Sequence, residues 1–212
     1  MELAYTALFI TLLPAILSIV KWSSLNASQR WFAVMLWFFV VVSFAGRIWT
    51  IITHGSNLPF FYIYIIGEYL MLLQVFRLMF DKKIKDSTWL NLAIIFTFLW
   101  LINVSTGNGW WEFPDYIRAV EIVIIVTIII YWFLEMLKDK IILHPYKTFE
   151  FWFCSGLFIY LCGNFLLFVF PKVILNSGKE VFLAIWKVNV ILNILLYLMY
   201  TVALLWVKRK VK

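Results

Sequence analysis

A small set of charged and amide side chains stands inside stretches that are otherwise apolar. Glu68, for example, lies near the middle of FFYIYIIGEYL, residues 60–70. An ionised group placed in an apolar environment is costly unless it finds a partner, so such residues mark candidate sites. The candidates for a ligand-binding site are Arg47, Tyr64, Glu68, Glu121, Tyr160, Asn164, Lys187, Asn189 and Asn193.

The composition decides which class of protein must position these side chains. The 212 residues are 65% hydrophobic, 20% aromatic and 14% charged. Soluble domains are about 45–50% apolar and about 25% charged, and a chain of this size could not bury so much apolar surface in water. We therefore expect an all-α integral membrane protein with one membrane domain, residues 1–212, in contact with the lipid bilayer.

Seven stretches are long and apolar enough to be predicted as transmembrane helices, for which about 20 residues are needed. Their approximate bounds are 3–20, 31–52, 60–79, 88–105, 116–137, 149–171 and 183–206. The connections between them are short, which makes consecutive helices neighbours and predicts an up-and-down bundle. The N-terminal stretch has no basic segment or small-residue cleavage site, so we interpret it as a span rather than a signal peptide.

The basic residues near the ends of the spans predict the orientation. On one side of the membrane, predicted to be the outer side, the loops contain only Lys172 and Lys179 of these cations. The cytoplasmic side retains most of the Lys and Arg, which predicts an outer N-terminus and a cytoplasmic C-terminus. The net charge of +7 is then a topology signal, and we expect no binding of nucleic acid. The cations of the predicted cytoplasmic side are Lys21, Arg30, Arg77, Lys82, Lys83, Lys85, Lys138, Lys140, Lys147, Lys208, Arg209, Lys210 and Lys212.

Depth along the helices predicts a partner for Glu68. At about 1.5 Å per residue, Glu68 lies about 12 Å and Arg47 about 7 Å below the outer ends of their spans. The two spans are consecutive, so we predict a buried Arg47–Glu68 ion pair; the alternative is that such a pair only fixes helix packing. The helix faces that would meet are Ser43, Gly46, Arg47 and Thr50 on one span and Tyr64, Gly67, Glu68 and Met71 on the next.

Three other groups of polar residues follow helical spacing. Arg118 and Glu121 are three residues apart and predict a local ion pair near the membrane surface. The sixth span carries Gly156, Tyr160, Gly163 and Asn164 on one face, and small residues with an amide are typical of close helix packing with an interhelical hydrogen bond. The seventh span carries a polar stripe of Asn189, Asn193, Tyr197 and Tyr200.

Seven of the nine candidate residues fall in the outer half of the predicted membrane: Arg47, Glu68, Glu121, Asn164, Lys187, Asn189 and Asn193. We therefore predict a cup that opens to the outside, has Glu68 at its floor, and takes a small polar ligand. No other chemistry is indicated. The two histidines, His54 and His144, fall on opposite sides, so we expect no metal site. Lys187 has no acidic residue one turn before it, which argues against a retinal cofactor, and no nucleophile elbow or phosphate-binding loop is present, so we expect no enzyme.

Three stretches resemble a family of small seven-span membrane proteins of Bacteroidota-type bacteria: NLPFFYIYIIGEY, FWFCSGLFIYLCGNFLLF and IWKVNVILNIL. The positions that match the family pattern are Asn57, Tyr64, Glu68, Trp152, Gly156, Tyr160, Gly163, Asn164, Trp186 and Asn193. Tyr62 and Asn189 stand where the family tends to have histidine, so any histidine-dependent chemistry would be absent here. We expect a multi-pass protein of the cell inner membrane, and the resemblance carries no established activity with it. Members look like frequent neighbours of sensor-kinase genes, which implies a sensory role.

From these observations we predict a receptor-like or sensory protein that binds a small ligand from outside and signals through a separate partner, such as a sensor kinase. Two alternatives stay open. A small-solute or proton-coupled transporter would need polar residues below Glu68, where its span offers only Gln74. A non-catalytic structural subunit of a membrane complex would use every polar group for packing alone.

Overall fold

The computed structural model of the chain describes residues 9–81, 83–106, 109–138, 144–170, 174 and 178–207. Within these residues the chain forms α-helices and short 3₁₀ turns, as the composition predicts. The α-helices are α2 (Leu12–Val20), α3 (Ala27–Thr53), α4 (Leu58–Phe80), α5 (Asp86–Ser105), α6 (Asp115–Lys138), α7 (Phe149–Val169) and α9 (Lys179–Leu205). The 3₁₀ turns are η1 (Trp22–Ser24), η2 (Gly109–Trp111) and η3 (Pro145–Lys147).

Six of these helices, α3 to α7 and α9, are long and apolar enough to cross a membrane, which indicates a multi-pass membrane protein. The first predicted span, residues 3–20, differs from the other six. Its residues 3–8 lie outside the described residues, and its described helix, α2, has nine residues, too few to cross a bilayer alone. The number of spans shown is therefore six.

Local sequence signals set several of the helix ends. Pro59 stands in the first turn of α4, where its missing N–H needs no partner. Thr148 precedes α7 and caps it, because its hydroxyl accepts a 3.3 Å hydrogen bond from the backbone N–H of Phe151. Gly178 precedes α9 with a φ of 100°, a conformation that residues with a side chain rarely adopt.

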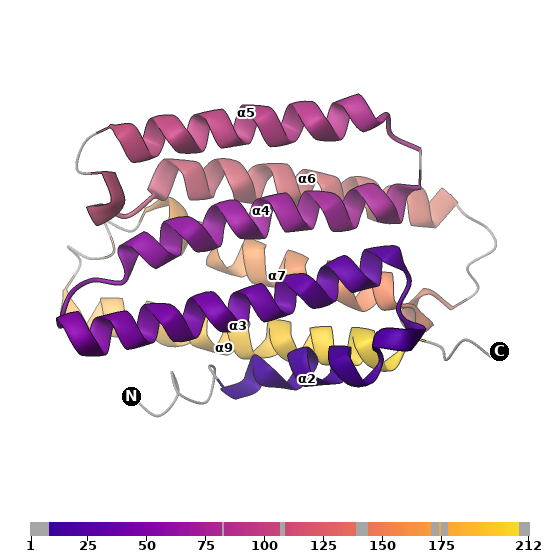
Figure 1. The fold of residues 1–212 in the computed structure, drawn as a ribbon, viewed down its shortest axis with the longest axis horizontal. Helices are drawn as coiled ribbons and strands as arrows, with labels where there is room; N and C mark the ends of the chain where they lie inside the picture. The colour runs from indigo at the N-terminus through magenta and orange to yellow at the C-terminus, as the bar shows by residue number, and fades with distance from the viewer. Residues whose placement is uncertain are drawn as a thin grey trace. The chain divides into compact units, whose positions relative to one another are not determined.

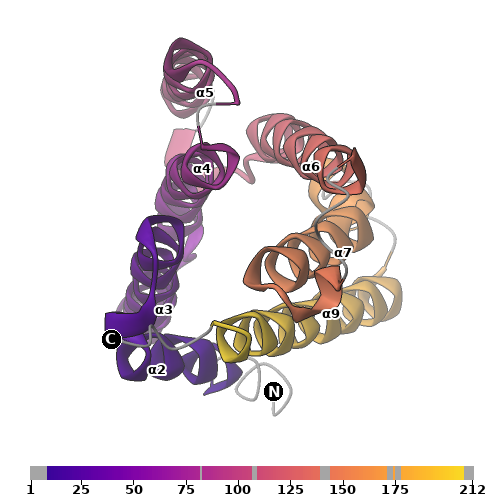
Figure 2. The same cartoon turned by 90° about the vertical axis from the view of Figure 1, so that its right-hand side faces the viewer.

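The chain divides into two compact units. The second unit, Ala27–Glu121, contains α3, α4, α5 and the first turns of α6. In Figures 1 and 2, α3 runs beside α4, and α5 lies beside α4. Glycines on both helices bring α3 and α4 close: a side chain at Gly46 would meet Phe60, and one at Gly67 would overlap the ring of Phe38.

The first unit, Met1–Asn26 and Ile122–Lys212, contains α2, most of α6, α7 and α9. Figures 1 and 2 show α7 beside α9, and α2 also lies against α9. Lys21, just after α2, donates hydrogen bonds to the backbone oxygens of Leu204 (2.9 Å), Leu205 (2.9 Å) and Val207 (3.3 Å). The ammonium group therefore caps the C-terminal end of α9, where a cation is favoured by the helix dipole.

The surfaces of the helices agree with contact to lipid. Large apolar side chains are exposed along them, for example Ile94, Ile95 and Phe98 on α5. Some of the cations that predict the orientation, among them Lys172 and the side chain of Lys179, lie outside the described residues. The other cations that lie outside the described residues are Lys82, Lys140, Lys208, Arg209, Lys210 and Lys212.

Candidate functional site

The second unit contains a buried cluster of three charged side chains, which we call the charge triad: Glu68, Arg118 and Glu121. The guanidinium Nη1 of Arg118 donates to Glu68 Oε2 of α4 and, at 2.5 Å, to Glu121 Oε2 of α6. The side chains of Arg118, Glu68 and Glu121 are 0%, 2% and 1% exposed, respectively. The triad thus links α4 to the first turns of α6 inside an apolar helical core.

Two predictions about these residues can be compared with this geometry. The local pair of Arg118 and Glu121 is confirmed, and both side chains are buried inside the protein. Their predicted position near the membrane surface stays a prediction. The predicted partner of Glu68 is wrong. Glu68 pairs with Arg118, whereas Arg47 is exposed on α3.

The triad holds two carboxylates and one guanidinium. It therefore carries one surplus negative charge unless one carboxyl group holds a proton. In addition, Glu121 Oε1 is buried and has no hydrogen-bond partner among the described residues. A buried network that is only partly satisfied is energetically sensitive to a small change in geometry or in protonation.

Aromatic contacts position α4 and the start of α6 around the triad. Tyr69, the residue after Glu68 on α4, stacks its ring on that of Phe96 of α5, with ring centroids 3.8 Å apart. Near the beginning of α4, the ring of Tyr62 packs edge-on against Trp110 of η2, with ring centroids 5.5 Å apart. Trp100 Nε1 of α5 donates a 3.2 Å hydrogen bond to the backbone oxygen of Tyr62. These contacts tie α4, α5 and η2 together, and η2 leads directly into α6.

A small pocket of about 110 Å³ opens between α3 and α4. Tyr64, which we had predicted for the site, lines it, with its ring stacked on Phe39 at 4.7 Å. Apolar and aromatic side chains form most of the wall, with Ser43, Asn57 and Tyr64 as the polar groups. The lining residues are Val42, Ser43, Gly46, Asn57, Phe60, Phe61 and Tyr64.

A second polar cluster lies in the first unit, between α7 and α9. Asn189 Nδ2 donates a 3.0 Å hydrogen bond to Asn164 Oδ1, and Asn164 Nδ2 donates at 3.0 Å to the backbone oxygen of Tyr160. Asn164 and Asn189 are both buried. The predicted interhelical hydrogen bond of Asn164 is therefore confirmed, and its partner is an amide of the predicted stripe on α9.

We expect the Asn164–Asn189 hydrogen bond to stabilise the protein by about 0.6 kcal/mol, and by less than about 2 kcal/mol, as is typical between transmembrane helices. A double-mutant cycle with Asn164→Ala and Asn189→Ala, followed by equilibrium unfolding in micelles, measures this coupling. A coupling energy of zero would show that the amide pair is not formed in the folded protein.

The remaining predicted site residues have different surroundings. Lys187 is exposed on α9, Asn193 is half-buried, and Tyr160 is buried on α7. The nine candidates are divided between the two units. Those of the second unit are Arg47, Tyr64, Glu68 and Glu121, and those of the first are Tyr160, Asn164, Lys187, Asn189 and Asn193. A single outward cup formed by all nine stays a prediction.

The sequence analysis missed two features of the site. It did not assign Arg118 to Glu68, because it paired Arg118 only with Glu121 on the same helix and paired Glu68 with Arg47 on the preceding helix. It also missed Asn57, Phe60 and Phe61 as pocket-lining residues. The signals that pointed to this region were the match of Asn57 to the family pattern and its position just before α4.

No group of three or more His, Cys, Asp or Glu side chains that could hold a metal ion is present in the part of the chain that the structure describes. Compared with models of protein families, with curated proteins and with solved structures, the chain matches none of them. The resemblance to small seven-span bacterial proteins therefore rests on its three sequence motifs.

Proposed function

We propose that the chain is a receptor-like sensory protein of the cell inner membrane, with seven spans, an outer N-terminus and a cytoplasmic C-terminus. A small ligand binds in the pocket between α3 and α4, and the charge triad responds to it. The observation that carries this proposal is that α4 contributes to both sites: Tyr64 lines the pocket, and Glu68, four residues later, belongs to the triad. Residues four apart lie on the same helix face, one turn from each other.

The dimensions and walls of the pocket define the ligand class. A cavity of about 150 Å³ accommodates benzene, so 110 Å³ favours a slightly smaller molecule. Aromatic walls favour an apolar body, and the Ser43 hydroxyl, the Asn57 amide and the Tyr64 phenol favour one or two hydrogen-bonding groups. Short alcohols, diols and amides have this chemistry.

The signal in this proposal is a shift of α4 relative to α6. A ligand changes a protein only through a difference in affinity between two conformations. The triad offers a second arrangement because Arg118 binds two carboxylates through one nitrogen atom and Glu121 Oε1 has spare hydrogen-bonding capacity. A cytoplasmic partner, for which the family resemblance favours a sensor kinase, would receive the shift.

Thermal unfolding of the purified protein in micelles, with a panel of C3 to C5 alcohols, diols and amides, tests the pocket. At least one of these probes is expected to raise the unfolding temperature of the wild type. Ser43→Leu fills the pocket and is expected to abolish the rise. Ser105→Leu, at an exposed position near the end of α5, is the matched control and should retain it. The receptor proposal fails if no probe stabilises the wild type, or if Ser43→Leu responds as the wild type does.

A proton-coupled transporter is the second candidate, and the surplus carboxylate of the triad favours it. A carboxyl group that gains and loses a proton could couple proton movement to solute movement. Proteoliposomes that contain the protein and a pH-sensitive dye distinguish the two functions. A carrier predicts probe-dependent proton uptake that Glu121→Gln removes, whereas a receptor predicts none. The structural-subunit alternative predicts neither ligand binding nor proton uptake.

A further inference from the structure

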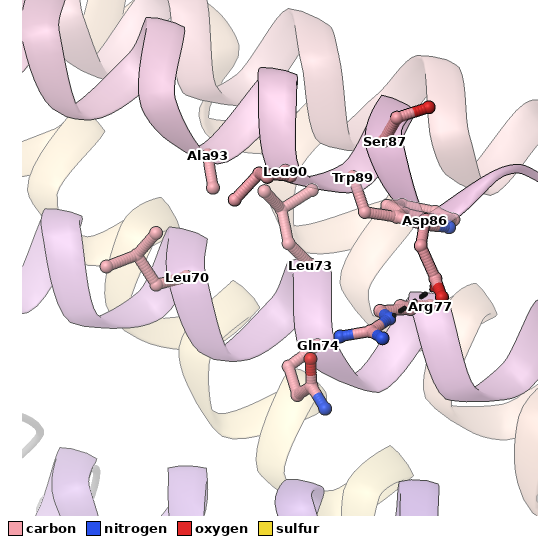
Figure 3. A pocket seen from close by; sticks show the side chains of 9 residues that line it. All are labelled: Leu70, Leu73, Gln74, Arg77, Asp86, Ser87, Trp89, Leu90 and Ala93. Atoms are coloured by element: carbon pink, nitrogen blue, oxygen red, sulfur yellow. Dashed lines mark hydrogen bonds and ion pairs between the residues drawn. The ribbon is translucent and has the colours of Figure 1, made fainter.

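A larger groove of about 510 Å³ lies between α4 and α5, at the opposite end of α4 from the small pocket. Figure 3 shows Leu73 of α4 and Leu90 and Ala93 of α5 extending into the space between the two helices. Its volume falls within the range of about 300–1,000 Å³ that is typical of binding sites for small molecules. The lining residues are Leu70, Leu73, Gln74, Arg77, Asp86, Ser87, Trp89, Leu90 and Ala93.

The groove is apolar along its length and polar at one end. At that end Arg77 Nε lies 2.9 Å from Asp86 Oδ1, and both side chains are accessible, at 45% and 77% exposure. Figure 3 shows this ion pair at the α4–α5 connection. An apolar groove that ends in an accessible guanidinium is complementary to a lipid molecule. The acyl chain would lie in the apolar part, and the headgroup would lie at the guanidinium.

Few side chains of α5 are buried, so α5 itself does not fill this groove. Of its residues Asp86–Ser105, all of which the structure describes, two are buried: Trp89 and Phe96. Trp89 packs on Phe80 at one end of the groove, with ring centroids 5.8 Å apart, and Phe96 packs on Tyr69 at the other. These aromatic contacts at both ends thus keep α4 and α5 apart along the groove.

The charge at the polar end identifies the kind of lipid. Between residues 77 and 86 the sequence carries four cations and two acids. Among the described cations of this stretch, Lys83 and Lys85 are exposed, as is Arg77. Clusters of Lys and Arg at the ends of transmembrane helices attract anionic headgroups, and the planar guanidinium fits a phosphate in two-point contact.

We propose that the groove between α4 and α5 binds an anionic phospholipid, with an acyl chain along Leu73, Leu90 and Ala93 and the phosphate at Arg77. The phosphate competes with Asp86 for the guanidinium. The bound lipid fills the groove between the two helices and so completes the packing of α5. This site is separate from the α3–α4 pocket, and it does not depend on the proposed receptor function.

Lipid titration of the delipidated protein, followed by native mass spectrometry, tests the site. The probes are phosphatidylglycerol and phosphatidylcholine with identical acyl chains. We expect phosphatidylglycerol to bind about fivefold more tightly, the effect of about one cation next to an anionic group. Arg77→Gln is expected to remove this preference, and Ala93→Phe, which fills the groove, is expected to weaken the binding of both lipids.

Three further variants separate this site from general attraction to the membrane surface. Lys138→Gln removes another cation of an exposed ion pair, and Ala184→Phe adds a ring at an exposed position of α9; both should bind as the wild type does. Asp86→Asn releases Arg77 from its ion pair and should tighten the binding of phosphatidylglycerol. Equal binding of the two lipids by the wild type, an unchanged preference in Arg77→Gln, unchanged binding in Ala93→Phe or weaker binding in Asp86→Asn would each overturn the proposal.

Discussion

Replacement of Arg118 by methionine is expected to lower the free energy of unfolding by about 3–5 kcal/mol. Arg118 has no exposed surface, and its guanidinium binds both Glu68 and Glu121. Methionine has a similar length but no charge, so the two buried carboxylates would lose their only cation in the triad. Equilibrium unfolding in mixed micelles, titrated with sodium dodecyl sulfate and followed by tryptophan fluorescence, measures the change.

Two comparisons make the Arg118 result specific. Lys138→Met removes the cation of an exposed pair, in which Lys138 Nζ lies 2.7 Å from Glu135 Oε1, and should cost less than about 1 kcal/mol. Adding Glu68→Gln and Glu121→Gln to Arg118→Met removes the uncompensated charges and should recover most of the loss. Equal effects of Arg118→Met and Lys138→Met, or no recovery in the triple variant, would contradict the buried triad.

The second large effect is expected at Gly156, where α7 and α9 pack closely. A Cβ atom at position 156 would lie 2.9 Å from Cβ of Met199 on α9, an atom close to the backbone that no side-chain rotation can remove. Gly156→Leu is therefore expected to push the two helices apart and to lower the free energy of unfolding by about 1–3 kcal/mol or more. The same unfolding titration measures it.

Cys162→Leu is the matched control for Gly156→Leu. Cys162 lies on the same helix and is exposed, so a larger side chain there is not forced into a close helix contact like that of Gly156. We expect an effect within about 0.5 kcal/mol, as for other surface substitutions. If Gly156→Leu were as mild as Cys162→Leu, α7 and α9 would not pack through this glycine.

Much of the fold could be predicted from the sequence, because a membrane span is a strong compositional signal. Six predicted spans correspond to the helices α3 to α7 and α9 within a few residues. Residues three or four apart on one helix were also predictable, as the Arg118–Glu121 pair shows. Asn164 could be assigned an interhelical bond because an amide beside Gly156 and Gly163 marks a close helix interface.

The partner of Glu68 could not be derived in this way. Short loops make consecutive helices neighbours, which favoured Arg47 on α3, but they do not determine which helix faces turn toward each other or which non-consecutive helices meet. Glu68 of α4 meets Arg118 of α6, so this pair depends on tertiary packing. The α3–α4 pocket depends equally on packing, because Gly46 admits Phe60 to a position that helical periodicity alone does not specify.

Infrared difference spectroscopy tests most directly whether the triad responds to a ligand in the α3–α4 pocket. The spectrum is recorded in the carboxyl C=O region, with and without the probe that most raises the unfolding temperature of the wild type. We predict a difference band that is lost in Glu68→Gln or Glu121→Gln and retained in Glu135→Gln, whose carboxylate belongs to the Lys138 pair outside the triad. No band in the wild type, or a band unchanged in both Glu68→Gln and Glu121→Gln, would contradict the coupling of pocket and triad.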